Sequence, residues 1–143
     1  MTYDYEKRVA YYETDMMGIV HHSNYIRWFE EARIEFLRSA DLSYRTMEDE
    51  DIQIPVVSVS CKYKTPAVFD DEIIVRTGIR KYNGIVAEIE YTVIKKSDGT
   101  VLVTGDSSHC FVDRETFKPV NIKKVRPDMH EKFLKSMEEG LCR

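Results

Sequence analysis

The chain has 143 residues, a formal net charge of −4 at pH 7 and 43% hydrophobic residues, a composition typical of a globular protein and not of a disordered one. This length predicts a single domain over residues 1–143, which can bury its own core without disulfides or a metal. The acidic balance argues against a nucleic-acid binder, which would carry an excess of basic residues. No apolar run reaches 18 residues, so we expect no membrane span.

Three cysteines, Cys61, Cys110 and Cys142, occur without a CxxC pair. An odd number with this spacing predicts free thiols in a reducing compartment. No apolar segment typical of a secretory signal stands at the N-terminus. Together these features predict a cytoplasmic protein.

The N-terminal part of the chain predicts a strand, a loop and a long helix. Residues 2–12 alternate loosely and are rich in tyrosine, which favours a strand. Gly18 permits a tight turn in the loop over residues 13–23. Ser23 or Asn24 is suited to cap the helix that follows. This helix extends to about residue 40, and its apolar residues recur at a spacing that predicts deep packing: Tyr25, Trp28, Phe29, Ala32, Phe36 and Leu37.

Strand patterns dominate the rest of the chain, after a short helical turn over residues 43–49. Asn83-Gly84 is the strongest short signal for a type I′ hairpin, and Asp98-Gly99 predicts a second hairpin. Pro127 suits the first turn of a C-terminal helix over residues 127–139. The four predicted strands, taken as consecutive antiparallel neighbours, cover residues 52–64, 71–82, 85–96 and 100–113.

This order of elements predicts an α+β fold. One apolar helix and one sheet must bury each other, so we expect a curved five-stranded antiparallel sheet wrapped around the long helix. An open sheet of this kind leaves two edges. Pairing of edges between copies would hide one of them, which predicts a homo-oligomer.

A carboxylate precedes the long helix. Asp15 lies nine residues before Asn24, and if the loop folds back, this carboxylate lies near backbone N–H groups that have no partner inside the helix. The N–H of His22 or Ser23 would then polarise a carbonyl oxygen, while Asp15 attacks the carbonyl carbon or activates a water. Such a site suits a thioester, whose leaving group needs no strong acid. The alternative is that Asp15 is only a turn or cap residue.

Other chemistries fit the sequence less well. His21 and His22 are adjacent and have no third ligand at metal spacing, so we predict no metal. A Ser-His-Asp triad would need a GxSxG elbow, which is missing. Glu31 is a rival carboxylate, but it lies about 10 Å along the helix from its start. An ion pair with Arg27 or Arg33, or a solvated face, is the alternative for Glu31.

Several segments together resemble the hotdog-fold acyl-CoA thioesterases, and in particular the YbgC / 4-hydroxybenzoyl-CoA thioesterase group. They are YETD, GIV, HHSNY and FEEAR within residues 12–33, then TPAVFDDEI and DGTVLVTGDSSHCFVD. The resemblance extends over nearly the whole chain. It implies a hotdog fold and edge-to-edge dimers, often assembled as a dimer of dimers in a homotetramer, with active sites at the dimer interface.

The resemblance also implies an activity, the hydrolysis of acyl-CoA or acyl-carrier-protein thioesters to free acid and thiol. In the family, the residue matching Asp15 is the catalytic nucleophile or general base, and the backbone N–H at His22 holds the thioester carbonyl. No metal or cofactor is required, because coenzyme A is part of the substrate. Gly18, Ser23 and Asn24 of the same motif are expected to bind substrate. His21 often aligns with an aromatic residue, so we expect no catalytic role for it.

The sequence departs from the family at Met16-Met17, because a small residue often follows the catalytic Asp. Flexible methionines could line an acyl pocket or simply fill space. Two other classes stay open: a hotdog hydratase, which adds water across a 2-enoyl thioester, and a non-catalytic acyl-CoA-binding module. Release of free thiol from a saturated acyl-CoA separates a thioesterase from both.

Overall fold

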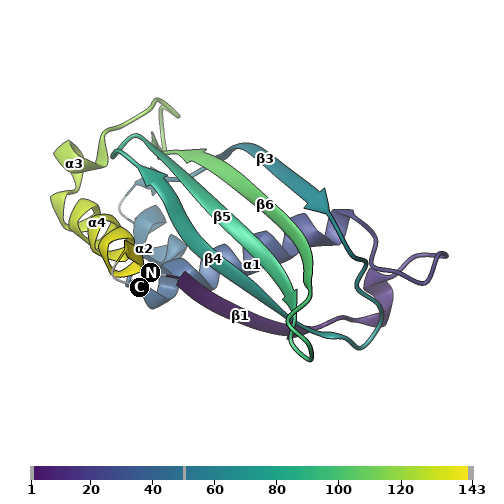
Figure 1. Cartoon of the computed structure of the whole chain (residues 1–143). Coiled ribbons are helices and arrows are strands. Elements are labelled where there is room, and N and C mark those ends of the chain that lie inside the picture. The colour runs from purple at the N-terminus through teal and green to yellow at the C-terminus, as the bar shows by residue number, and fades with distance from the viewer. Residues whose placement is uncertain (1, 50, 142–143) are drawn as a thin grey trace.

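A five-stranded antiparallel sheet wraps around the long helix α1 (Ser23–Ser39), as the sequence predicted (Figure 1). The computed structural model describes residues 2–49 and 51–141, so Cys142, which the sequence predicts to be a free thiol, lies outside the described residues. Cys61 and Cys110 are free thiols. In spatial order, the strands are β1 (Thr2–Arg8), β4 (Glu72–Tyr82), β5 (Val86–Lys95), β6 (Val101–Cys110) and β3 (Val56–Tyr63).

The main core lies between α1 and the sheet, because α1 buries a wide apolar stripe. Trp28, Phe29 and Phe36 are fully buried. Phe29 stacks on Tyr91 of β5, with the ring centroids 4.3 Å apart. Gly105 of β6 approaches the same ring, and a Cβ at this position would lie 2.6 Å from a Phe29 carbon. This close approach needs a glycine and seats the helix against the sheet.

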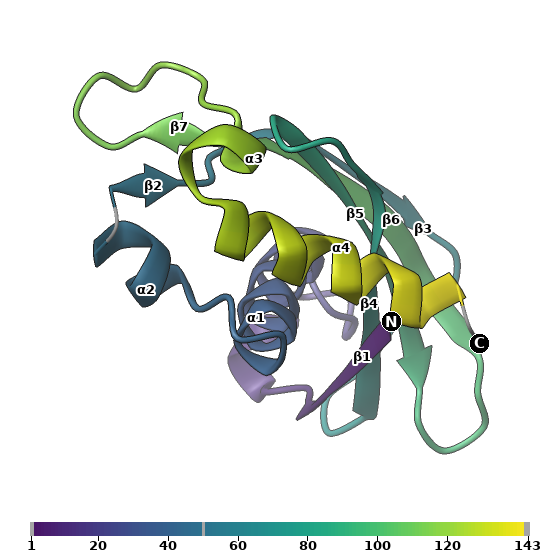
Figure 2. The ribbon, with the colours of Figure 1, turned by 90° about the vertical axis from the view of Figure 1, so that its left-hand side faces the viewer.

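A second apolar cluster closes one end of the sheet. The helix α4 (Pro127–Leu141) packs against β4 and contributes Met129 and Phe133 to this cluster, beside Phe111. Figures 1 and 2 show α4 at the end of the sheet remote from the loop that enters α1.

None of the described helices is long and apolar enough to cross a membrane. The short elements are η1 (Tyr11–Glu13), α2 (Tyr44–Asp49), β2 (Ile52–Gln53), β7 (Val112–Asp113) and α3 (Ile122–Val125).

Three predicted strand boundaries are wrong. The first strand ends at Arg8 and not at residue 12, because residues 11–13 form the 3-10 turn η1. The predicted strand over residues 52–64 is two strands, β2 and β3, with Pro55 between them, and proline has no N–H to donate to a ladder. The predicted strand over residues 100–113 is also two strands. β6 ends at Cys110, and β7 pairs instead with β2 in a separate ladder.

The Asn83-Gly84 hairpin joins β4 to β5 as predicted, but its turn is not type I′. A type I′ turn needs a positive φ at both central residues, whereas Gly84 has a φ of +90° and Asn83 has a negative φ. The backbone N–H of Asn83 donates to the carbonyl of Val86 at 3.2 Å. The centre of the turn is therefore Gly84-Ile85, one residue later than predicted. The Asp98-Gly99 hairpin between β5 and β6 is confirmed.

The later strands do not pair in chain order. β3 lies at the edge beside β6, remote from β4, and β1 takes the place next to β4. Among the described residues, β3 has only β6 as a neighbour, so its other side is an open edge. Val59 of β3 pairs with the buried Ser107, and Tyr63 pairs with the buried Val103, which places both side chains on the helix-facing side of the sheet. Both are nevertheless exposed.

Candidate active site

The loop between β1 and α1 folds back on itself as a narrow hairpin, which projects beyond the end of the sheet in Figure 1. Thr14 and Val20 form an antiparallel bridge, and the N–H of Asp15 donates to the carbonyl of Ile19 at 3.0 Å. Gly18, with a φ of +80°, closes the tip by donating its N–H to the carbonyl of Asp15 at 2.9 Å. The loop therefore returns Asp15 toward the start of α1.

Asp15 and His22 line the same pocket, which has a volume of about 280 Å³. One carboxylate oxygen of Asp15, Oδ1, accepts the N–H of Met17 at 2.8 Å, which fixes the side chain in the turn. His22 is the N-cap residue of α1. The other lining residues are Met17, Ile19, Val20, Tyr25, Tyr63, Lys64, Thr65 and Pro66.

The backbone N–H of His22 has no hydrogen-bond partner among the described residues, whereas its neighbours are bonded. His21 donates its N–H to the carbonyl of Glu13 at 2.9 Å, and Ser23 donates its N–H to Nδ1 of His21 at 3.2 Å. The sequence left a choice between His22 and Ser23 as a carbonyl-binding donor. Because the N–H of Ser23 already has an acceptor, the N–H of His22 is the better candidate for binding a carbonyl oxygen.

Tyr63 contacts the carbonyl group of His22, in the peptide unit that follows the one carrying the His22 N–H. Its hydroxyl donates to the carbonyl of His22 at 3.4 Å, and the two rings meet edge to face with centroids 6.2 Å apart. Burial, together with the neighbouring Cys61, raises the pKa of Tyr63 to about 12, so the phenol stays protonated and remains a donor. Sequence reasoning missed Tyr63, because 41 residues separate it from His22.

The predicted substrate-binding residues Gly18, Ser23 and Asn24 do not line this pocket. Ser23 Oγ lies 2.8 Å from Nδ1 of His21, so the predicted capping by Ser23 or Asn24 is wrong. Asn24 is buried, and its Nδ2 donates to the carbonyl of Glu13 at 2.8 Å. These three residues shape the loop and the helix start, and their contact with substrate stays a prediction.

Glu31 lies outside the pocket. Its Oε2 accepts the hydroxyl of Tyr5 at 2.9 Å and lies 3.5 Å from Nζ of Lys7, so its ion-pair partner is Lys7 and not Arg27 or Arg33. Within the described part of the chain, no three His, Cys, Asp or Glu side chains are placed to hold a metal ion. Met17 lines the pocket, whereas Met16 is fully exposed.

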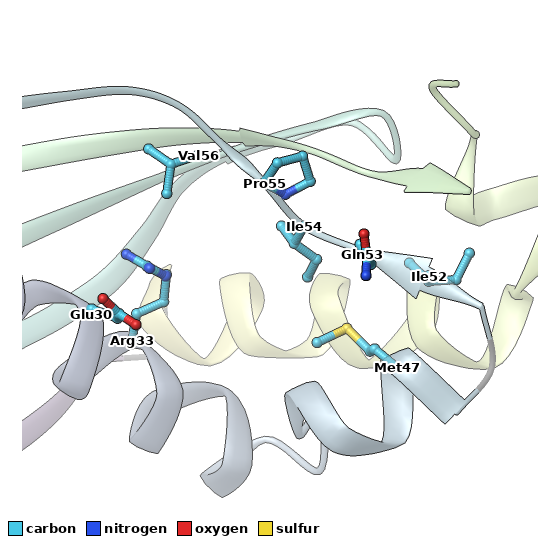
Figure 3. Close-up of a pocket in the computed structure, with 8 residues that line it drawn as sticks. All are labelled: Glu30, Arg33, Met47, Ile52, Gln53, Ile54, Pro55 and Val56. Carbon is cyan, nitrogen blue, oxygen red and sulfur yellow. The ribbon is translucent and has the colours of Figure 1, made fainter. Parts of the chain in front are cut away.

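A second cavity, of about 330 Å³, lies at the other end of β3 (Figure 3). Figure 3 shows Arg33 reaching from α1 toward Val56, at the start of β3. Arg33 is itself buried and donates to the hydroxyl of Tyr91 at 3.1 Å. The lining residues are Glu30, Arg33, Met47, Ile52, Gln53, Ile54, Pro55 and Val56.

The sheet wrapped around α1 defines a hotdog-fold protein, with a pocket lined by Asp15 and His22 at the start of that helix. The chain belongs to the Thioesterase-like superfamily, whose family model matches residues 9–133. This membership confirms the resemblance seen in the sequence.

Individual relatives agree with this assignment. The Bacillus subtilis protein YneP, whose name proposes an acyl-CoA thioesterase, is 36% identical over 92% of this chain and 94% of its own length. The acyl-CoA thioesterase YbgC of Haemophilus influenzae is 28% identical over 90% of this chain and 94% of its own. Among solved structures, the DHNA-CoA thioesterase of Staphylococcus aureus superposes with a TM-score of 0.89 at 30% identity, over 94% of this chain and 89% of that one.

Proposed function

We propose that the protein hydrolyses acyl-CoA thioesters to the free acid and coenzyme A. The observation that carries this proposal is that Asp15 and His22 line one pocket, together with a His22 N–H that has no partner among the described residues. Several relatives are named as thioesterases of acyl-CoA substrates, which supports the same substrate class here. An acyl-carrier-protein thioester is the second candidate substrate, and location in the cytoplasm stays a prediction.

Two routes satisfy the chemistry. As a nucleophile, Asp15 attacks the thioester carbon, the C–S bond breaks, coenzyme A leaves as thiolate, and water then hydrolyses the mixed anhydride. As a general base, Asp15 takes a proton from water, which adds to the carbon before the C–S bond breaks. In both routes the N–H of His22 stabilises the negative oxygen. A thiol has a pKa of about 8.5, so the thiolate leaves without a strong acid, and no further cofactor is needed.

We also propose that the active unit is a homodimer formed through β3. The open edge of β3 carries Val57 and Tyr63, which are 65% and 51% exposed. Natural proteins rarely leave such an apolar edge uncovered. Antiparallel pairing of two copies would place the end of β3 in one copy, at Tyr63, beside the start of β3 in the other, at Val56. The pocket of Asp15 in one copy and the cavity of Arg33 in the other would then lie side by side at the interface. Assembly of two such dimers into a dimer of dimers stays a prediction.

The test is thiol release from a panel of acyl-CoA and acyl-carrier-protein substrates, aromatic and aliphatic. The wild-type protein should release thiol from saturated acyl-CoAs, and Asp15→Asn should lower turnover by about 10²–10⁴-fold with the fold intact. Asp98→Asn is the matched control, because Asp98 accepts the N–H of Thr100 in a similar turn remote from the pocket. Turnover near the wild-type level in Asp15→Asn would reject the mechanism.

The same assay separates the alternatives. Water addition to a 2-enoyl-CoA without thiol release would identify a hydratase. Saturable binding of acyl-CoA without any hydrolysis would identify a binding module.

A further inference from the structure

Glu13 is a buried carboxylate between β1 and α1 that the proposed mechanism does not use. It is 3% exposed. Its Oε2 accepts the indole N–H of Trp28 at 2.5 Å and the ammonium of Lys7 at 3.2 Å, and its Oε1 accepts the backbone N–H of Ala10 at 2.8 Å. The side chain is therefore anchored to α1, to β1 and to the segment that follows β1.

The backbone of Glu13 is equally well connected. Its carbonyl accepts the N–H of His21 at 2.9 Å and Nδ2 of Asn24 at 2.8 Å. The first bond closes the base of the hairpin that carries Asp15, and the second joins that base to the first turn of α1. One residue thus connects the segment carrying Asp15 to the segment carrying the N–H of His22.

We propose that Glu13 is a positioning residue, which holds the Asp15 carboxylate in register with the N–H of His22. This inference rests on the proposed function. Asp15 follows Glu13 by two residues, and His22 follows the bonded His21 directly, so a shift of Glu13 moves both reacting groups. A displacement of about 1 Å in such a site costs about 100-fold in rate.

The carboxylate form is what the surroundings of Glu13 require. Burial raises the pKa of Glu13, but the hydrogen bonds from Ala10, Trp28 and Lys7 outweigh burial and hold the pKa below its usual range. Each carboxylate oxygen accepts at least one N–H. A glutamine offers only one acceptor oxygen, so its amide NH₂ would face a second N–H donor. Glu13→Gln therefore keeps the volume and breaks the anchor.

The experiment compares Glu13→Gln with Glu31→Gln, assayed below the melting temperature of each variant. Glu31 receives the same substitution and shares the partner Lys7, but its other partner is Tyr5 of β1 and not the loop that carries Asp15. We expect kcat to fall by about 10- to 100-fold in Glu13→Gln, with KM within about threefold of wild type. We expect Glu31→Gln to stay near wild type. Amide exchange of His21 should accelerate only in Glu13→Gln, because its acceptor is the Glu13 carbonyl.

A double mutant separates positioning from general destabilisation. In the Asp15→Asn background, Glu13→Gln should add little further loss, because the group that it positions is already removed. An unchanged kcat in folded Glu13→Gln, or an equal loss in both backgrounds, would overturn the inference. If Asp15→Asn alone keeps activity, the proposed function fails instead.

A second variant keeps the inference testable if Glu13→Gln does not fold. Trp28→Phe removes the indole N–H donor and retains an aromatic ring in the core. It should lower kcat several-fold by the same route. A wild-type kcat in folded Trp28→Phe would count against the inference.

Discussion

Ser107 Oγ lies 2.7 Å from Nε2 of His109, and both residues belong to β6 and are buried. The pair belongs to a buried chain of polar groups, because Arg33 donates to Tyr91 and the Tyr91 hydroxyl lies 2.7 Å from Ser107. Arg33 can only donate, so the simplest order has Tyr91 donating to Ser107 and Ser107 donating to Nε2. This order requires a neutral imidazole.

His109 should make the protein sensitive to acid. Burial, and then the charge of Arg33, lower the pKa of His109 to about 4 from the ordinary value of 6.5. The unfolded chain therefore binds more protons than the folded one between these values, and stability falls as pH falls through this window. Between pH 7 and pH 5 we expect a loss of about 2 kcal/mol from this group. Urea unfolding at both pH values measures it, and His109→Gln should remove that part of the pH dependence.

Gly105→Ala should destabilise the protein by about 1–3 kcal/mol, because the interior is overpacked by the added methyl group. The new Cβ would lie 2.5 Å from the Ser60 carbonyl oxygen and 2.6 Å from the Phe29 ring. Thermal unfolding measures the loss. In a Phe29→Leu background the cost of the alanine should shrink, since the ring contact is relieved. Equal costs in both backgrounds would show that the ring is not the obstacle.

Val57→Lys should convert the proposed dimer to a monomer and lower its activity. In the proposed pairing, with Tyr63 of one copy beside Val56 of the other, a lysine at residue 57 would lie opposite Lys62 of the other copy, and like charges directly opposite each other destabilise a strand pair. Val57 is 65% exposed in the single chain, so the fold itself should tolerate the change. Light scattering after size exclusion measures the mass. Val125→Lys, at a site 49% exposed on α3, is the control and should leave the mass unchanged.

Tyr63→Phe should lower kcat by about 2- to 10-fold, the equivalent of one hydrogen bond of about 0.5–1.5 kcal/mol. The substitution removes the donor to the carbonyl of His22 and keeps the ring. Steady-state kinetics on the best acyl-CoA substrate measures the effect. Tyr11→Phe, at an exposed residue outside the pocket, should behave as wild type. No difference between the two variants would mean that the hydrogen bond from Tyr63 to the His22 carbonyl does not contribute to turnover.

The sequence alone determined the elements whose signals are local. The spacing of Trp28, Phe29 and Phe36 predicted α1 as a buried helix, and the Asp98-Gly99 hairpin was also correct. The motif around Asp15 predicted the family, because its residues are contiguous. A strand end has a weak local signal where a turn competes with the strand, so the sequence predicts a first strand over residues 2–12, although β1 ends at Arg8 and Tyr11–Glu13 form η1.

Only the tertiary structure decided which distant residues meet. Strand order depends on pairing across the whole sheet, so the placement of β3 at the edge could not follow from its own composition. From the sequence, Glu13 is a loop residue, and only the structure shows that it accepts hydrogen bonds from Trp28 and Lys7. Tyr63 contacts His22 because β3 ends beside the start of α1. Contiguous residues determine local periodicity and turn chemistry. Packing across long loops decides which of those residues form the site, because such contacts leave no spacing signal in the chain.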